Sequence, residues 1–198
     1  MYKINEIFYS IQGEGARAGS ANVFVRFAGC DMTCGFCDTE FESGRDMKAE
    51  DIVKEALRLM PHYGPASCSV ILSGGEPTLQ YNEPLAKAFR DAEIYVAIET
   101  NGGTPLKAAV DWISCSPKVA DHVVSKNFPK GVDELRYVRH PGQGIPVAAG
   151  IAAIHHFLSP QFNGDRLSRE SLEYCIKLVK EHPLWKLSLQ AHKIWGVR

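Results

Sequence analysis

Three cysteines lie close together near the start of the chain, in the segment GCDMTCGFCDTEF. Cys30, Cys34 and Cys37 follow a C-x3-C-x2-C spacing, and the aromatic Phe36 stands directly before the last of them. An iron-sulfur cube has four iron corners and normally takes four thiolates, so a loop with three leaves one iron open to a small molecule. The spacing therefore indicates a 4Fe-4S cluster that binds a second cofactor at its open iron.

Zinc could use the same loop, with Asp38 or a distant histidine as the fourth ligand. Structural zinc sites usually close with paired C-x2-C or histidine spacings, and this sequence contains no second pair with such a spacing. A disulfide framework fits less well, because 198 residues can bury an adequate core and the chain shows no secretory signal. The other cysteines, Cys68, Cys115 and Cys175, stand alone in apolar or helical settings, so we expect small buried side chains.

Paired glycines mark a second segment, SVILSGGEP, over residues 69–77. Gly74 and Gly75 follow a predicted strand, and the absence of side chains lets the backbone approach a ligand closely. On its own, Gly-Gly-Glu-Pro is typical of a simple turn. Because it follows a strand and comes after the cysteine loop, it predicts instead a strand end that binds a cofactor.

The composition is that of an ordinary enzyme domain. The chain is 45% hydrophobic with a net charge of −1, and it has neither a polybasic stretch for nucleic acid nor an acidic tail. No apolar run approaches the roughly 20 residues that cross a bilayer. We therefore expect a cytoplasmic protein with reduced thiols that acts on a small molecule, not on nucleic acid or a membrane.

Short β-branched runs alternate with helical patterns along the chain, which predicts an α/β fold with a parallel sheet. Ligands of such sheets gather at the carboxyl ends of the strands. We find no internal repeat or linker, so residues 1–198 are expected to form a single domain. The expected strands are residues 23–28, 69–73, 94–99, 111–116, 134–138, 152–158 and 186–190, and the expected helices are 49–60, 82–92 and 168–182.

The two motifs resemble the cluster loop and the GGEP segment of radical S-adenosylmethionine enzymes. The likeness to one family, 7-carboxy-7-deazaguanine synthase, extends from Glu6 to Arg198. It is carried by the segments EIFYSIQGEG, VFVRFAGC, FCDTEF, SGGEP, IETNG, SPK and LSLQAHKIWGVR. The resemblance implies an incomplete TIM-like barrel of parallel strands with outer helices, in a homodimer. It also implies a lyase that converts 6-carboxy-5,6,7,8-tetrahydropterin into 7-carboxy-7-deazaguanine with loss of ammonia, on the route to queuosine and related 7-deazapurines.

The resemblance implies how the cofactors are held. Thr39, after the third cysteine, is expected to bind Mg2+, whose hard oxygen ligands would include the substrate carboxylate. An electron from a flavodoxin- or ferredoxin-like donor would reduce the cluster, and S-adenosylmethionine would yield a 5′-deoxyadenosyl radical that takes hydrogen from the pterin. The residues expected to contact S-adenosylmethionine are Phe36, Gly75, Glu76, Ser116, Pro117 and Lys118, and the strand-end loop Ser159, Pro160, Gln161 and Phe162.

The resemblance also implies the substrate site. A carboxylated pterin has a negative charge and a guanine-like edge, so its pocket needs a cation, amides and carboxylates. Glu14 would accept from ring N–H groups, whereas on residue type alone it would be a solvated turn residue. Gln190, His192 and Lys193 are expected at the end of the last strand. The expected substrate-binding residues are Ile11, Gln12, Gly13, Glu14, Arg26, Ser73, Gln190, His192 and Arg198.

Two other functions share part of this pattern. An enzyme that activates a glycyl radical on a partner protein would share the cysteine loop and the GGEP segment. It has no reason, however, to contain QGEG, the CDT that follows the loop, or the QAHK tail. A zinc module or an electron carrier would need a further metal pair or a fourth thiolate near the cluster. The sequence therefore favours the carboxydeazaguanine synthase reaction.

Overall fold

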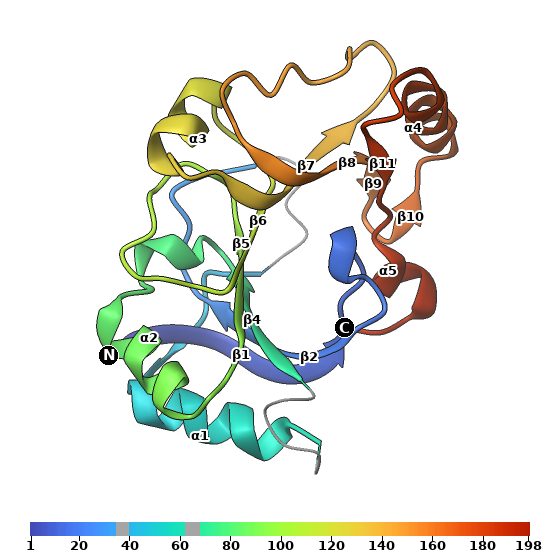
Figure 1. Ribbon diagram of the computed structural model, residues 1–198. Helices are drawn as coiled ribbons and strands as arrows, with labels where there is room; N and C mark the ends of the chain where they lie inside the picture. The colour runs from blue at the N-terminus through green and yellow to red at the C-terminus, as the bar shows by residue number, and fades with distance from the viewer. Residues whose placement is uncertain (35–39, 62–67) are drawn as a thin grey trace. The chain divides into compact units, whose positions relative to one another are not determined.

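The structure, a computed structural model, describes residues 1–34, 40–61 and 68–198 (Figure 1). The chain divides into two compact units. Unit 1 consists of residues 1–10, 21–100 and 104–113, and unit 2 of residues 11–20, 101–103 and 114–198. The single domain expected for residues 1–198 stays a prediction.

Unit 1 is built on strands in the order β5-β4-β2-β1-β3. The pairs β2·β4 and β4·β5 are parallel, and β3 pairs antiparallel with β1. One 3-10 turn and two helices connect these strands in the described part of the unit. The elements are β1 (Tyr2–Ile11), β2 (Ala21–Phe27), β3 (Arg45–Met47), α1 (Ala49–Leu59), β4 (Ser69–Gly74), η3 (Pro77–Leu79), α2 (Glu83–Asp91), β5 (Val96–Thr100) and the start of β6 (Trp112–Cys115).

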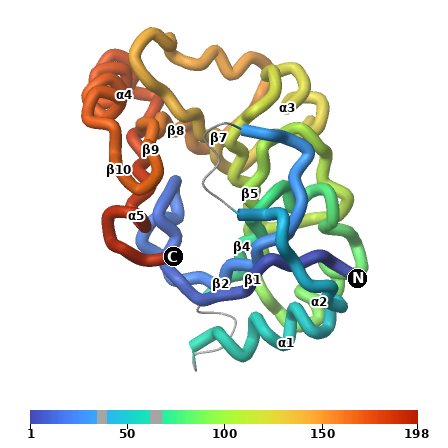
Figure 2. The backbone as a smooth tube through the Cα atoms, turned by 180° about the vertical axis from the view of Figure 1, so that it is seen from behind, coloured from blue at the N-terminus to red at the C-terminus, as the bar shows by residue number. Residues whose placement is uncertain are grey.

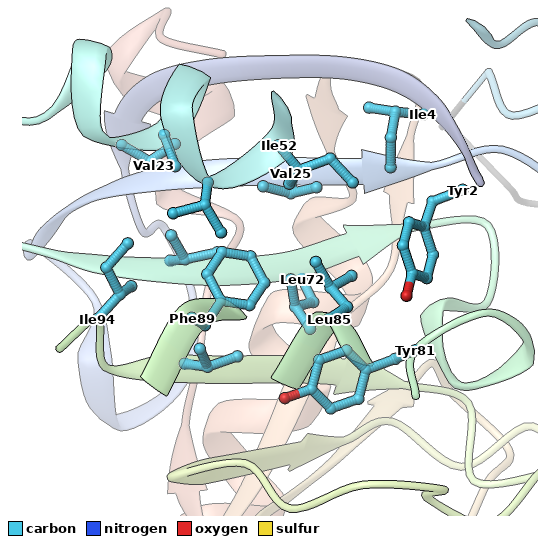
Figure 3. Close-up of a cluster of buried hydrophobic side chains, with 14 of the residues drawn as sticks. Tyr2, Ile4, Val23, Val25, Ile52, Leu72, Tyr81, Leu85, Phe89 and Ile94 are labelled. Carbon is cyan, nitrogen blue, oxygen red and sulfur yellow. The ribbon is translucent and has the colours of Figure 1, made fainter. Parts of the chain in front are cut away.

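Alternation along these strands separates two faces of the unit 1 sheet. One face packs under α1 and α2, where Val25, Leu72, Ile52 and Phe89 are fully buried (Figure 3). The opposite face carries a smaller apolar cluster of Phe8, Phe24, Ile71 and Ala97, with Trp112 packed against it. The helices thus cover one face of this sheet. Polar residues at the strand ends can be reached by a ligand only on the opposite face, beyond the smaller apolar cluster.

Unit 2 is built on parallel strands in the order β11-β8-β7-β6. Helix α4 packs along β8, as Figure 2 shows. Trp185 packs against β7 and β8, with its ring centre 6.0 Å from that of Tyr137 and 5.2 Å from that of His156. The elements are η1 (Gly15–Arg17), α3 (Asp121–Asn127), β7 (Val132–Arg139), β8 (Ala153–Pro160), β9 (Phe162–Asn163), β10 (Arg166–Leu167), α4 (Arg169–Glu181), β11 (Lys186–Leu187) and α5 (Ala191–Trp195).

Most expected elements are confirmed with small shifts at their ends. Strand β1 was missed, although Tyr2, Ile4, Phe8 and Ser10 are buried at even positions, which is the alternation of a half-buried strand. In α1, Ile52, Val53 and Ala56 are buried, whereas Leu57 of the same helix is 41% exposed. Buried positions of the isolated cysteines are confirmed for Cys68, Cys115 and Cys175.

The expected strand over residues 186–190 is wrong beyond Leu187. The backbone N–H of Ser188 still donates to Leu158 of β8, at 2.9 Å. Further along, the N–H of Ala191 donates to the carbonyl of Gly13 and not to β8. The chain therefore leaves the sheet and begins the short helix α5.

Of the helices in the described ranges, none is both long enough and apolar enough to cross a bilayer.

Candidate functional site

The predicted site residues fall into two groups, one in each unit. In unit 1 a polar row crosses the carboxyl ends of three parallel strands. Arg26 of β2 pairs in register with Ser73 of β4, and the register of β4 with β5 places Glu99 next to Ser73. The Ser73 hydroxyl donates to Oε2 of Glu99 at 3.1 Å. The row lies on the face away from α1 and α2, two positions beyond the apolar cluster, as the period of a strand requires.

Arg26 is held in place from the side of β1. Its Nη1 lies 2.7 Å from Oε1 of Glu6, and its guanidinium carbon lies 4.9 Å from the centre of the Phe8 ring. Phe8 in turn stacks on Phe24, with ring centres 5.2 Å apart. The Arg26 side chain remains 30% exposed, so the cation is oriented yet accessible to an anionic ligand.

The cysteine loop begins directly after β2. Cys30 and Cys34 are half-buried, and the N–H of Gly29 donates to the carbonyl of Phe41 at 2.7 Å, which closes the base of the loop. Burial, followed by the negative charges of Asp31 and Glu76, raises the pKa of the Cys30 thiol. A thiolate at this position therefore needs a positive partner, which a metal centre supplies.

The GGEP segment packs against this loop through backbone alone. The N–H of Gly75 donates to Phe27 and that of Glu76 to Gly29, both at 2.9 Å. A side chain on Gly75 would begin 1.9 Å from the Gly29 oxygen and 3.2 Å from the Cys30 nitrogen. Only a glycine allows this approach. The bare backbone edge beside the Cys30 backbone fits a cluster with a second cofactor at its open corner.

The side chain of Glu76 has an internal role that the sequence did not reveal. It is 1% exposed, and its Oε1 accepts from the Thr78 amide, the Thr78 hydroxyl and the Thr100 hydroxyl at 3.1, 2.7 and 2.8 Å. These bonds satisfy a buried carboxylate and tie the GGEP turn to the end of β5. The buried side chain of Glu76 therefore stabilises the conformation of the GGEP turn.

In unit 2 the QGEG segment forms a tight turn. Gln12 is 6% exposed, and its side-chain oxygen accepts from the Glu14 amide at 3.1 Å. The turn lies beside α5 (Figure 2), where the Ala191 N–H donates to Gly13 at 3.0 Å. A side chain on Gly13 would begin 2.3 Å from Nδ1 of His192. The structure therefore brings Gln12, Gly13 and His192 together.

Gln190 and His192 were expected at the end of the last strand. This prediction is wrong, because β11 ends at Leu187. Gln190 instead precedes the first residue of α5, and His192 lies in that helix. Lys193, from the same helix, donates to the Gly164 carbonyl at 2.9 Å. Arg198, the last residue, is exposed.

Two charged residues next to Glu14 were missed as functional candidates. Arg136 and Glu134 lie on β7, at alternate positions of a strand predicted only from its apolar residues. Nη2 of Arg136 lies 3.0 Å from Oε2 of Glu14, and the three side chains are almost completely buried. Two charges within a buried strand were the available signal, because charges are rarely buried without a partner.

The segments expected to bind S-adenosylmethionine in unit 2 lie at or after strand ends. Nζ of Lys118 donates to the Ser116 hydroxyl at 2.8 Å, which orders the loop after β6. Ser159 and Pro160 are the last residues of β8, not part of a loop, and Phe162 begins β9. Ser159 is 2% exposed, and no atom of the described residues hydrogen-bonds its hydroxyl. A buried hydroxyl in this state suits a polar ligand.

Three expected site residues, Phe36, Cys37 and Thr39, lie outside the described residues.

Known proteins resemble this chain over its whole length. The model of the radical SAM superfamily matches residues 24–137, more than half of the chain. The chain is 41% identical to a 7-carboxy-7-deazaguanine synthase of Bacteroides thetaiotaomicron, with 100% of both chains covered. It is 36% identical to a 7-carboxy-7-deazaguanine synthase of Burkholderia multivorans, with 99% of each covered. The crystal structure of QueE from Escherichia coli has a TM-score of 0.74 at 20% identity, over 95% of this chain and 93% of that one. This likeness confirms the predicted fold class.

Proposed function

Since the chain belongs to the 7-carboxy-7-deazaguanine synthase family of the radical SAM superfamily, we propose that it converts 6-carboxy-5,6,7,8-tetrahydropterin into 7-carboxy-7-deazaguanine with loss of ammonia. The observation that carries this proposal is the 41% identity over all 198 residues. The reaction belongs to queuosine biosynthesis. An enzyme that activates a glycyl radical is not favoured, because relatives matched along the whole chain share the synthase name.

Membership of the radical SAM superfamily implies a 4Fe-4S cluster and S-adenosylmethionine. When bound, these groups supply a 5′-deoxyadenosyl radical able to abstract hydrogen from the substrate. Cys30, Cys34 and Cys37 would hold the cluster. The bare backbone at Gly75 and the buried hydroxyl of Ser159 support contacts with S-adenosylmethionine. The other expected contacts, at residues 116–118, lie in a loop already ordered by Lys118.

Each unit contains polar residues that are candidates for contacts with the substrate. Arg26, held by Glu6, offers a cation to the substrate carboxylate, and Ser73 offers a hydroxyl. Glu14 would accept from the N–H groups of the guanine-like edge. His192, Gln190 and the chain end complete the proposed set. Fixed groups of this kind keep a reactive intermediate in one orientation and exclude water.

Further partners follow from the family and not from the described geometry. Thr39 would bind Mg2+ together with the substrate carboxylate. A flavodoxin- or ferredoxin-like protein would donate the electron, and the enzyme would act as a cytoplasmic homodimer in one domain.

The test is turnover by protein reconstituted anaerobically with iron and sulfide. With dithionite, S-adenosylmethionine, Mg2+ and the carboxypterin, the expected product is 7-carboxy-7-deazaguanine, identified by its mass and absorbance. Omitting the carboxypterin provides the control. Cleavage of S-adenosylmethionine without conversion of the carboxypterin would refute the proposed substrate while leaving the radical chemistry in place.

A further inference from the structure

A buried group of three charges lies beside the QGEG turn in unit 2. Arg136 of β7 stands between two carboxylates, with Nη2 at 3.0 Å from Oε2 of Glu14 and Nη1 at 3.5 Å from Oε1 of Glu134. The side chains of Arg136, Glu14 and Glu134 are 8%, 14% and 2% exposed. Ionised, the group carries one net negative charge in a place that water hardly reaches. Such a costly arrangement needs a reason beyond packing.

Glu134 fixes the backbone of the turn. Its Oε2 accepts from the Ala16 N–H at 2.8 Å. Its two carboxylate oxygens occupy the space of a side chain on Gly15, since a Cβ there would lie 2.2 and 2.4 Å from them. Gly15 has a φ of +69°, and its N–H donates to the Ser188 hydroxyl at 2.9 Å. The turn after Glu14 is therefore held from β7 and from the residue after β11.

Arg136 fixes the side chain of the same turn. Its guanidinium is planar and rigid, so a contact at one oxygen restricts how the Glu14 carboxylate can rotate. Glu134 lies on the other side of the guanidinium, with its Oε1 at 3.5 Å from Nη1 of Arg136. The two β7 residues thus set both the position of the Glu14 backbone and the orientation of its carboxylate.

We infer that Arg136 and Glu134 are positioning residues that aim Glu14 at the 2-amino and N3–H donors of the pterin ring. The inference rests on the proposed function, in which Glu14 contacts that edge. It assigns these two residues to selectivity for the amino-substituted ring, through Glu14, and not to the radical step.

The test compares two ligands that differ at the 2-amino group. Reconstituted holoenzyme with S-adenosylmethionine and Mg2+ is titrated with 6-carboxypterin and with 6-carboxylumazine, which carries an oxo group in its place, by ligand fluorescence. Arg136→Met should raise the Kd for 6-carboxypterin by about tenfold, equivalent to about 1.4 kcal/mol. The Kd for 6-carboxylumazine should change by less than about threefold, and Arg136→Lys should fall between Met and Arg because it keeps the charge without the fork.

If Arg136 had a purely structural role, Arg136→Met would weaken the binding of both ligands equally. That result, or unchanged affinities for both ligands, would overturn the inference. Formation of 5′-deoxyadenosine without substrate should stay at the wild-type rate. Arg139→Met is the matched control, because Arg139 lies on the same strand and contacts Tyr137 and Gly144 instead. It should leave the ratio of the two affinities unchanged.

Arg136→Met leaves two buried carboxylates without a cation, so its thermal unfolding is measured first. If it does not fold, the double variant Glu134→Gln/Arg136→Met removes one charge of each sign and carries the same test with the same expected loss of selectivity. Wild-type protein that cleaves S-adenosylmethionine but neither binds nor converts a carboxypterin would refute the proposed function itself. Wild-type turnover with an unchanged ligand ratio in the folded variants would refute only the positioning role.

Discussion

Gly75→Ala tests the close approach between the GGEP turn and the cysteine loop. The new Cβ would lie 1.9 Å from the Gly29 oxygen and 2.5 Å from the Gly29 carbonyl carbon, both backbone atoms that cannot rotate away. Gly75 has no positive φ, so alanine fits the local backbone and the whole penalty is steric. Because ordinary contact begins at 3.4 Å, the two segments must separate by about 1.5 Å.

That separation breaks the hydrogen bond from the Glu76 N–H to the Gly29 carbonyl, which is 2.9 Å long. Overpacking costs about 1–3 kcal/mol, and a buried donor left unsatisfied costs about 1–3 kcal/mol more. The expected loss is therefore about 2–6 kcal/mol of unfolding free energy, which lowers the Tm by about 4–24 °C for a chain of this size. Glu76 would also move relative to Thr100, whose hydroxyl it accepts at 2.8 Å.

The assay has two readouts: thermal unfolding of the metal-free protein, and iron bound after anaerobic reconstitution. Gly75→Ala should unfold earlier and retain less iron, because the cysteine loop loses the edge against which it packs. Gly144→Ala is the matched control, since nothing lies within 4 Å of a Cβ there, and its stability should change by less than about 0.5 kcal/mol. If the two variants unfold at the same temperature and bind equal iron, the close approach is wrong.

Three further predictions concern single side chains. Cys30→Ala should abolish the cluster, whereas the Cys68→Ala variant should bind as much iron as the wild type, because Cys68 is a buried side chain outside the C-x3-C-x2-C motif. Stoichiometric zinc in place of iron would contradict the cluster assignment. Thr39→Val should remove the stimulation of turnover by Mg2+ while 5′-deoxyadenosine still forms under dithionite, and persistent stimulation would show that the metal binds elsewhere. Burial raises the pKa of Cys175 from 9.0 to about 11, so the folded state keeps the neutral thiol while the unfolded chain ionises first. Stability should consequently fall between pH 9 and pH 11, by about 1–2 kcal/mol more in the wild type than in Cys175→Ala, as measured by denaturant unfolding at each pH.

Motifs at strand ends were predictable because their chemistry depends on spacing along the chain. The cysteine loop and the GGEP segment each follow one strand, and the alternation of residues predicted β2 and β4 within two residues of their ends. Parallel pairing in register then brings Arg26, Ser73 and Glu99 into one row. Each of these facts needs only local periodicity and the rule that parallel strands end at the same edge.

The course of the tail could not be predicted, because distant backbone partners decide it. Ala191 bonds to Gly13 and Ser188 accepts from Gly15, so the last strand stops early and a helix carries His192. The local sequence does not indicate whether the backbone N–H of Ala191 will bond to β8 or to Gly13.

The sequence by itself determined the cysteine chemistry, the α/β class and the family, because residue type and spacing carry that information. Only the tertiary structure decided that Glu76 stabilises its own turn and that Arg136 joins Glu14 to Glu134. Glu14 and Arg136 are far apart along the chain, and the free energy of a buried charge depends on which opposite charge folding brings within contact.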